Sequence, residues 1–159
     1  MLKITFAIVL ALCFVLPTRA AWAGSPGRRK PPPPLAKLVH QRIVLAKKIE
    51  FDSWQVQQRS HPLLKAVARI FREHRKLTVR IEVHSDSRGS APFNRMRTQN
   101  LAEQLKKILV KMGVKAQRLK AVGRGEAYPI DSNRTREGRA KNRRIEFHVI
   151  PRKKRRPRP

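Results

Sequence analysis

Four stretches of the chain alternate apolar and polar residues in the manner of β-strands. Residues 77–84 alternate without a fault, and residues 144–149 repeat the pattern; residues 48–52 and 118–123 show it over a shorter length. Because successive side chains of a strand point to opposite faces, each stretch predicts a strand with one buried face. The other face of the sheet is expected to be open to water, since it would carry only polar side chains: Thr78, Arg80, Glu82, His84, Arg144, Glu146 and His148.

Two stretches between these strands carry apolar residues at the spacing of one helix face. The first contains Leu63, Leu64, Val67, Ile70 and Phe71, and the second contains Leu101, Leu105, Ile108, Leu109 and Met112. Pro62 suits the first turn of one helix, Ser90 and Pro92 suit the start of the other, and Gly113 suits its left-handed cap. With a short helix before the last strand, the order predicts an α/β (α+β) sandwich, βαβαβ(α)β. Its helices would pack on one face of a small mixed four-stranded sheet.

Charge divides the chain into a mixed centre and basic ends. The 159 residues include 38 Lys and Arg but only 10 Asp and Glu, for a net charge of +28, and every acid lies between Glu50 and Glu146. This length suits one folded domain, which we expect at residues 47–150. A disulfide within the chain is excluded because Cys13 is its only cysteine.

The first 23 residues have the three parts of a secretory signal peptide. A lysine near the start precedes an apolar run at 4–17, and Ala21 to Ala23 supply the small residues that a signal peptidase requires. The run is shorter than the ~20 residues of a membrane-spanning helix, although an uncleaved anchor remains an alternative. Cys13 lies inside the run, which disfavours a lipoprotein signal. The sequence therefore predicts an exported protein.

The segments on either side of the expected domain are rich in proline and basic residues. Residues 24–46 are interpreted as a linker, because a basic stretch leads into four prolines at 31–34 that favour a polyproline II spacer. Within it, residues 35–46 fit either a short helix or an extended lead-in. Residues 151–159 hold six cations and predict a disordered tail.

Three motifs in the centre of the chain resemble a known family. Residues 83–90 read Val-His-Ser-Asp-Ser-Arg-Gly-Ser and are followed by Asn94, Ala102 and Leu105; residues 122–126 read Val-Gly-Arg-Gly-Glu; and residues 133–146 read Asn-Arg-Thr-Arg-Glu-Gly-Arg-Ala-Lys-Asn-Arg-Arg-Ile-Glu. In this order they closely resemble the OmpA-like domain of bacterial envelope proteins, the C-terminal domain type of OmpA, Pal and MotB. The resemblance covers about residues 47–150.

The resemblance implies a non-catalytic protein that binds peptidoglycan non-covalently through the diamino acid of the stem peptide. It implies an anchor to the cell wall, in the periplasm or on the periplasmic face of the outer membrane of a Gram-negative bacterium. No cofactor is expected. An outer-membrane protein and anionic lipid are further candidate partners.

The end of a diamino acid side chain carries an ammonium and a carboxylate on one carbon. A receptor therefore needs a carboxylate and a cation a few ångströms apart. Asp86, at a strand end, matches the family's binding aspartate, and Asn94 matches a position that lines the same pocket. Ser85 and Gly89, in the same loop as Asp86, are also expected among the peptidoglycan-binding residues. The alternative for Asp86 is a loop residue that only accepts bonds from the backbone of residues 87–89.

The chain departs from the family at the arginine that holds the ligand carboxylate. This position is Leu101, whereas Arg97 stands where the family has leucine, one helical turn earlier. One hypothesis is that Arg97 performs the arginine's task from its displaced position. The other is that the ligand site has decayed, with Leu101 in the apolar stripe and Arg97 solvated.

A second family signature supplies Arg139, Asn142 and Arg143, followed by Arg144. Strand alternation turns Arg144 away from Ile145 and Phe147. For most of these residues we expect a supporting role, bracing the loop that carries Asp86 through charged hydrogen bonds.

The remaining features do not indicate an enzyme. No nucleophile stands with a base, Asp86 has no partner carboxylate, and His84 and His148 have no third ligand for a metal. The positive charge leaves an alternative function, a salt-sensitive binder of anionic phospholipid, wall polymer or nucleic acid on a decayed OmpA-like scaffold. Nucleic acid is disfavoured by the export signal. A pocket predicts that binding depends on Asp86 at any salt concentration, whereas charge alone predicts binding that fades with salt.

Overall fold

The structure is a computed structural model that describes residues 33–52 and 55–151. The expected signal peptide at 1–23, the start of the linker and residues 152–159 of the expected tail lie outside this range.

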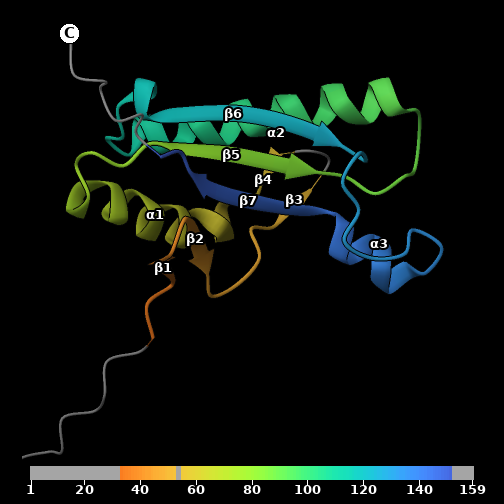
Figure 1. Ribbon diagram of the computed structural model, residues 1–159, viewed down its shortest axis with the longest axis horizontal. Coiled ribbons are helices and arrows are strands. Elements are labelled where there is room, and N and C mark those ends of the chain that lie inside the picture. The colour runs from red at the N-terminus through yellow and green to blue at the C-terminus, as the bar shows by residue number, and fades with distance from the viewer. Residues whose placement is uncertain (1–32, 53–54, 152–159) are drawn as a thin grey trace, which may run out of the picture. The chain divides into compact units, whose positions relative to one another are not determined.

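A five-stranded mixed sheet forms the centre of the domain (Figure 1). Its strands, in spatial order, are β1 (Ala36–Val39), β2 (Arg42–Leu45), β7 (Arg144–Val149), β5 (Val79–His84) and β6 (Leu119–Gly125). Neighbours pair antiparallel from β1 to β5, and β5 pairs parallel with β6. The parallel pair is joined by a helical crossover, which such a connection requires.

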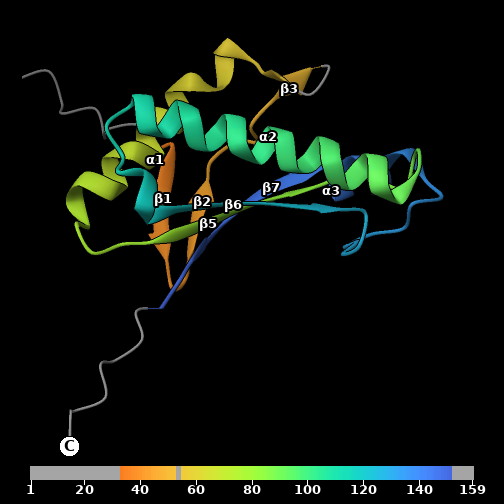
Figure 2. The same cartoon turned by 90° about the horizontal axis from the view of Figure 1, so that it is seen from above.

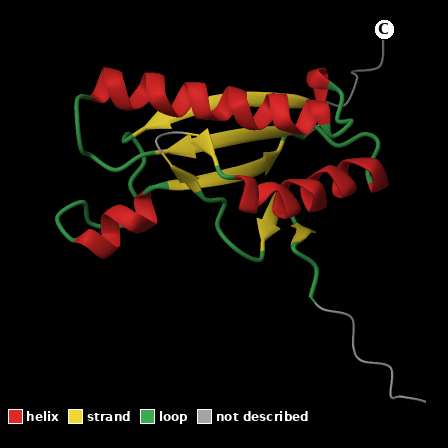
Figure 3. Cartoon of the chain, turned by 180° about the vertical axis from the view of Figure 1, so that it is seen from behind, coloured by secondary structure: helices red, strands yellow, loops and turns green. Residues whose placement is uncertain are grey.

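Helices α1 (His61–Glu73) and α2 (Ala91–Lys111) pack on the same face of this sheet (Figures 2 and 3). Their apolar stripes and the inner strand positions form one core, with the largest fully buried side chains being Phe71, Phe147, Leu64, Ile81, Leu101, Leu105 and Leu109. The short helix α3 (Arg136–Asn142) precedes β7, and single 3₁₀ turns lie at Gln58–Ser60 (η1) and Ala116–Arg118 (η2). The predicted α+β sandwich is confirmed. None of the described helices is long and apolar enough to cross a membrane.

The start of the sheet differs from the prediction. β1 and β2 form a hairpin inside the segment interpreted as linker, so the sheet has five strands instead of four, and it begins at Ala36. The predicted strand at 48–52 is reduced to β3 (Phe51–Asp52), which pairs with β4 (Gln55–Val56) in a separate ribbon.

The hairpin was not apparent because its strands are only four residues long and lie among prolines and lysines. Its turn includes His40, which adopts a positive φ of 51° where glycine or asparagine would give a recognisable signal. Pairing of Ile43 with Phe147 joins the hairpin to the core and fixes its place in the sheet.

Helix α2 lies unusually close to β6. The backbone N–H of Gly123 donates to the Gln99 side chain over 2.7 Å, and the N–H of Gly125 donates to the Thr98 hydroxyl over 3.0 Å. A Cβ at Gly123 would lie 2.2 Å from the Gln99 nitrogen. Glycine is therefore required at position 123 by close approach of the two backbones. This contact positions the start of α2 beside the ends of β5 and β6.

Candidate functional site

The loop between β5 and α2 holds Asp86 in a buried position. The N–H of Ser85 donates to the Gly125 carbonyl over 2.9 Å, which attaches the loop to β6. The Asp86 side chain accepts a hydrogen bond at Oδ2 from the guanidinium of Arg143 at 2.6 Å, and at Oδ1 from the Arg88 N–H at 3.2 Å. The bond from the Arg88 N–H is the kind expected if Asp86 were only a loop residue that accepts backbone hydrogen bonds. The ion pair with Arg143 goes further, because it places a cation directly on the carboxylate.

Asn94, in the first turn of α2, ties this loop to the end of β6. Its side chain is buried and donates to the Asp86 carbonyl at 3.4 Å and to the Glu126 carboxylate at 2.6 Å. Gly89 turns the loop with a φ of 92°, a conformation that favours glycine. Glu126 was missed as a site residue, although it ends the Val-Gly-Arg-Gly-Glu motif.

Residues of the second signature shape the neighbouring loop at 130–134. Asn142 is fully buried; its Oδ1 accepts the N–H groups of Ile130 and Asp131, and its Nδ2 donates to Asp131 and Asn133. Arg139 donates to the carbonyls of Asn133 and Arg134, each over 2.8 Å. The Asn133 side chain then accepts the N–H of Ser87 at 3.4 Å, so these residues reach the Asp86 loop indirectly. Arg143 is the member of this group that contacts Asp86 itself.

The exchanged residues of α2 have different surroundings. Leu101 is completely buried in the core, so this position does not present a side chain to solvent. Arg97 is half-buried and lies with its guanidinium carbon 4.7 Å from the ring centroid of Phe93, in a cation–π contact. Ser85 is buried, and its hydroxyl has no hydrogen-bond partner within the described part of the chain.

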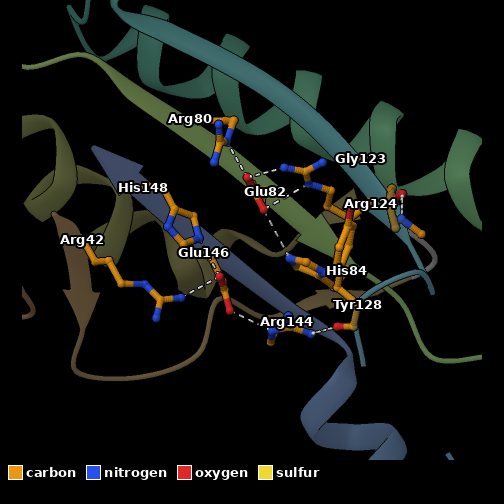
Figure 4. A network of polar contacts seen from close by, with 12 residues as sticks. Arg42, Arg80, Glu82, His84, Gly123, Arg124, Tyr128, Arg144, Glu146 and His148 are labelled. Atoms are coloured by element: carbon orange, nitrogen blue, oxygen red, sulfur yellow. Dashed lines mark hydrogen bonds and ion pairs between the residues drawn. The ribbon is translucent and has the colours of Figure 1, made fainter. Parts of the chain in front are cut away.

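Two glutamates form ion pairs on the face of the sheet opposite α1 and α2, which we call the helix-free face (Figure 4). Glu82 pairs with Arg80 and with Arg124, whose Nη2 lies 2.8 Å from a carboxylate oxygen. Glu146 pairs with Arg42, Arg144 and His148 at 2.6–2.8 Å. Burial opposes ionisation of both carboxyls, but these partners outweigh it, so the pKa of Glu82 is lowered and that of Glu146 falls from 4.5 to about 2.

His84 lies on the same face with a side chain that is only 3% exposed. Its pKa is lowered from 6.5 to about 4, mainly by burial; Arg144 and Arg124 also lower the pKa, while Glu146 and Glu82 oppose the shift. None of the described helices covers the predicted open face, but Glu82 and His84 are nevertheless buried there.

The same face brings together a set of metal-type ligands that the sequence did not reveal. Single ligand atoms of Glu82, Glu146 and His148 lie within 4.8 Å of one another. Both carboxylates already accept bonds from arginines, so a divalent cation would have to displace those partners. The arrangement favours an ion-pair network over a metal centre.

Residues 50–143 match the model of the OmpA family, and the chain belongs to this family. Outer membrane porin F of Pseudomonas fluorescens is 37% identical over 116 residues, which are 73% of this chain and 35% of that protein. The probable lipoprotein YiaD of Escherichia coli is 38% identical over 88 residues, or 55% of this chain and 40% of YiaD. The chain thus spans well under half the length of these relatives.

Solved structures show the same fold. The peptidoglycan-associated lipoprotein of Burkholderia pseudomallei is 27% identical with a TM-score of 0.60, over 65% of this chain and 87% of that one. The cell wall anchor of the type VI secretion system of Pseudomonas aeruginosa is 31% identical with a TM-score of 0.61, over 72% and 85% of the two chains. The resemblance noted in the sequence is confirmed at the level of family and fold.

Proposed function

We propose that this domain is a peptidoglycan-binding module of the cell envelope that holds the diamino acid of the stem peptide at the Asp86 loop. The single observation that carries the proposal is the pair of Asp86 and Arg143, a buried carboxylate and a partly exposed guanidinium 2.6 Å apart. The names of the two solved relatives, a peptidoglycan-associated lipoprotein and a cell wall anchor, support it.

The pair has the chemistry that a zwitterionic side-chain end requires. Each carboxylate oxygen can accept more than one hydrogen bond, so Asp86 retains capacity for a ligand ammonium. The side chain of Arg143 is 40% exposed, and within the described residues only one of its guanidinium nitrogens forms a hydrogen bond. Its remaining donors suit a ligand carboxylate, for which arginine offers a planar fork.

In this proposal Arg143 takes the part that the family gives to the arginine missing at position 101. Arg97 is the second candidate for that part, since it follows Asn94 by three residues on one helix face. Ser85 and Gly89 shape the loop, while Arg139 and Asn142 support it from the loop at 130–134. The location that goes with this function is the periplasm or the periplasmic face of the outer membrane.

Sedimentation with peptidoglycan sacculi at low and high salt tests the proposal. Asp86→Ala should weaken binding by about tenfold or more at both salt concentrations, because a charged hydrogen bond in a buried site is lost. Arg143→Ala should weaken it similarly, with Arg143→Lys retaining part of the binding, whereas Lys107→Ala on the outer face of α2 serves as a control for charge. Melting temperatures identify variants that fail for lack of folding.

The variant Arg97→Ala separates the two candidate cations. Unchanged binding assigns the role to Arg143, and a loss confined to Arg97→Ala assigns it to Arg97. Binding that disappears with salt and ignores Asp86→Ala would reject the pocket in favour of general polyanion binding.

A further inference from the structure

The helix-free face of the sheet carries exposed cations on four of its five strands. Ala36 and Leu119 belong to the core, and Leu38 and Ala121 pack against it, so strand alternation places Lys37 and Lys120 on the opposite face. Arg42 and Arg80 occupy the corresponding positions of β2 and β5, because Ile43 and Ile81 are buried in the core. Figure 4 shows two of the four side chains, those of Arg42 and Arg80, on this face.

The strand register aligns three of these cations with a histidine in one row. Lys120 is level with Arg80, Arg80 with His148, and His148 with Arg42. Since neighbouring strands lie about 4.8 Å apart, the row crosses four strands over about 14 Å. Basic side chains therefore cross most of the width of this face.

The acids of this face are hidden from solvent. The described strands place two carboxylates here, Glu82 and Glu146, whose side chains are 8% and 20% exposed and pair with arginines. Elsewhere on the domain, Glu50 and Glu73 have side chains that are 54% and 58% exposed. A partner that approaches the helix-free face thus meets cations, with little competing negative charge.

The chain leaves the sheet beside this row. The N–H of Ile150 donates to the Thr78 carbonyl over 2.8 Å, and Pro151 lines a surface hollow with Lys76, Thr78 and Lys120. The sequence that follows, residues 152–159, contains six more cations. Pro151, the last residue that the structure describes, therefore lies beside Lys120 of the edge strand β6.

We propose that this face docks on a bilayer surface that contains anionic phospholipid. Its cations lie on several neighbouring strands, so they can contact several lipid head groups of one bilayer surface at the same time. Val44, 43% exposed beside Arg42 on β2, adds an apolar contact of the kind that interfacial surfaces use. Each basic residue near an anionic bilayer contributes modestly, so the number of cations decides the affinity.

This inference is independent of the Asp86 site. Asp86 follows Arg80 by six residues, or about 20 Å along the strand direction, so the loop and the cationic row lie at different ends of the sheet. A domain that binds stem peptide at one end and lipid head groups along the helix-free face would hold the wall close to a membrane.

Flotation of the full chain with vesicles tests the proposal. Vesicles of phosphatidylethanolamine with about one quarter phosphatidylglycerol should bind the protein, and vesicles of phosphatidylcholine should not. The double variant Lys37→Gln, Lys120→Gln should bind the anionic vesicles about tenfold less tightly. The control variant Lys107→Gln, Lys111→Gln removes the same charge from the exposed side of α2 and should change binding by less than about twofold.

Equal losses in the two double variants would overturn the proposal. They would show that vesicle binding depends on the net charge of the protein and not on the cations of the helix-free face. Binding to phosphatidylcholine vesicles, or binding to a soluble polyphosphate but to no vesicle, would also overturn it. Sacculus binding should be unchanged in Lys37→Gln, Lys120→Gln. The lipid-docking proposal and the peptidoglycan-binding proposal can therefore be rejected independently of each other.

Discussion

Alanine in place of Gly123 is expected to destabilise the domain by about 3 kcal/mol or more. The new Cβ would lie 2.2 Å from the Gln99 nitrogen and 2.6 Å from its Cα, and both atoms belong to the backbone of α2. No side-chain rotation relieves such a contact, so α2 and β6 would have to separate. Separation would also break the bond from the Gly123 N–H to the Gln99 side chain. Urea denaturation measures the effect.

Gly113→Ala is the matched control. Gly113 has a φ of 92° and no atom within 4 Å of a new Cβ, so its substitution tests backbone conformation without a clash. We expect a cost of about 1 kcal/mol. If Gly123→Ala unfolded at the same urea concentration as the wild type, or cost no more than Gly113→Ala, the close packing of α2 on β6 would be contradicted.

Stability is expected to fall by about 3 kcal/mol as the pH is lowered from 6.5 to 4, because of His84. Its ring is buried, and within the described residues neither ring nitrogen has a hydrogen-bond partner. The pKa is 6.5 in the unfolded chain and about 4 in the fold. Between these values the unfolded state binds the proton and the folded state does not, so acidification favours unfolding. More than about one pH unit above 6.5 or below 4 the histidine adds little slope.

Urea denaturation across this range measures the effect, and His84→Leu should remove most of the slope between pH 6.5 and 4. His40→Asn, at an exposed turn position that tolerates positive φ, should retain the slope. The ionised form of Glu146 stabilises the fold above pH 4.5, and that contribution is lost as the pH falls toward 2. It therefore acts mainly below the window of His84. Equal slopes in wild type and His84→Leu would show that the buried imidazole is not the cause.

Strict patterns in the sequence were reliable guides to the fold. The alternation at 144–149 corresponds to β7 residue for residue, and the faultless stretch at 77–84 contains β5. The left-handed cap expected at Gly113 is confirmed by its φ of 92°. These features are local, so a few neighbouring residues determine them. The β1–β2 hairpin is determined by its pairing with β7, about a hundred residues later, and this long-range contact leaves little trace in a four-residue strand.

The candidate site could be predicted from the sequence only in part, because it too depends on long-range contacts. Motifs identified Asp86 and Asn94, which both lie near the end of β5. The bond from Arg143 to Asp86 joins residues that are 57 positions apart, and the bond from Asn94 to Glu126 spans 32. No spacing rule connects such pairs, and the family signature predicted only that cations such as Arg143 support the Asp86 loop. Leu101 was foreseen in the apolar stripe of α2, and its complete burial fits that pattern.

The central claim is that Asp86 and Arg143 together receive both charges of the diamino acid. Titration calorimetry of the full chain with a soluble stem peptide containing diaminopimelate tests it most directly, beside the same peptide with lysine in that place. Lysine keeps the ammonium and lacks the carboxylate. The diaminopimelate peptide is expected to bind about tenfold more tightly or better, and Arg143→Ala should abolish this preference. Equal affinity for the two peptides, or binding to neither, would contradict it.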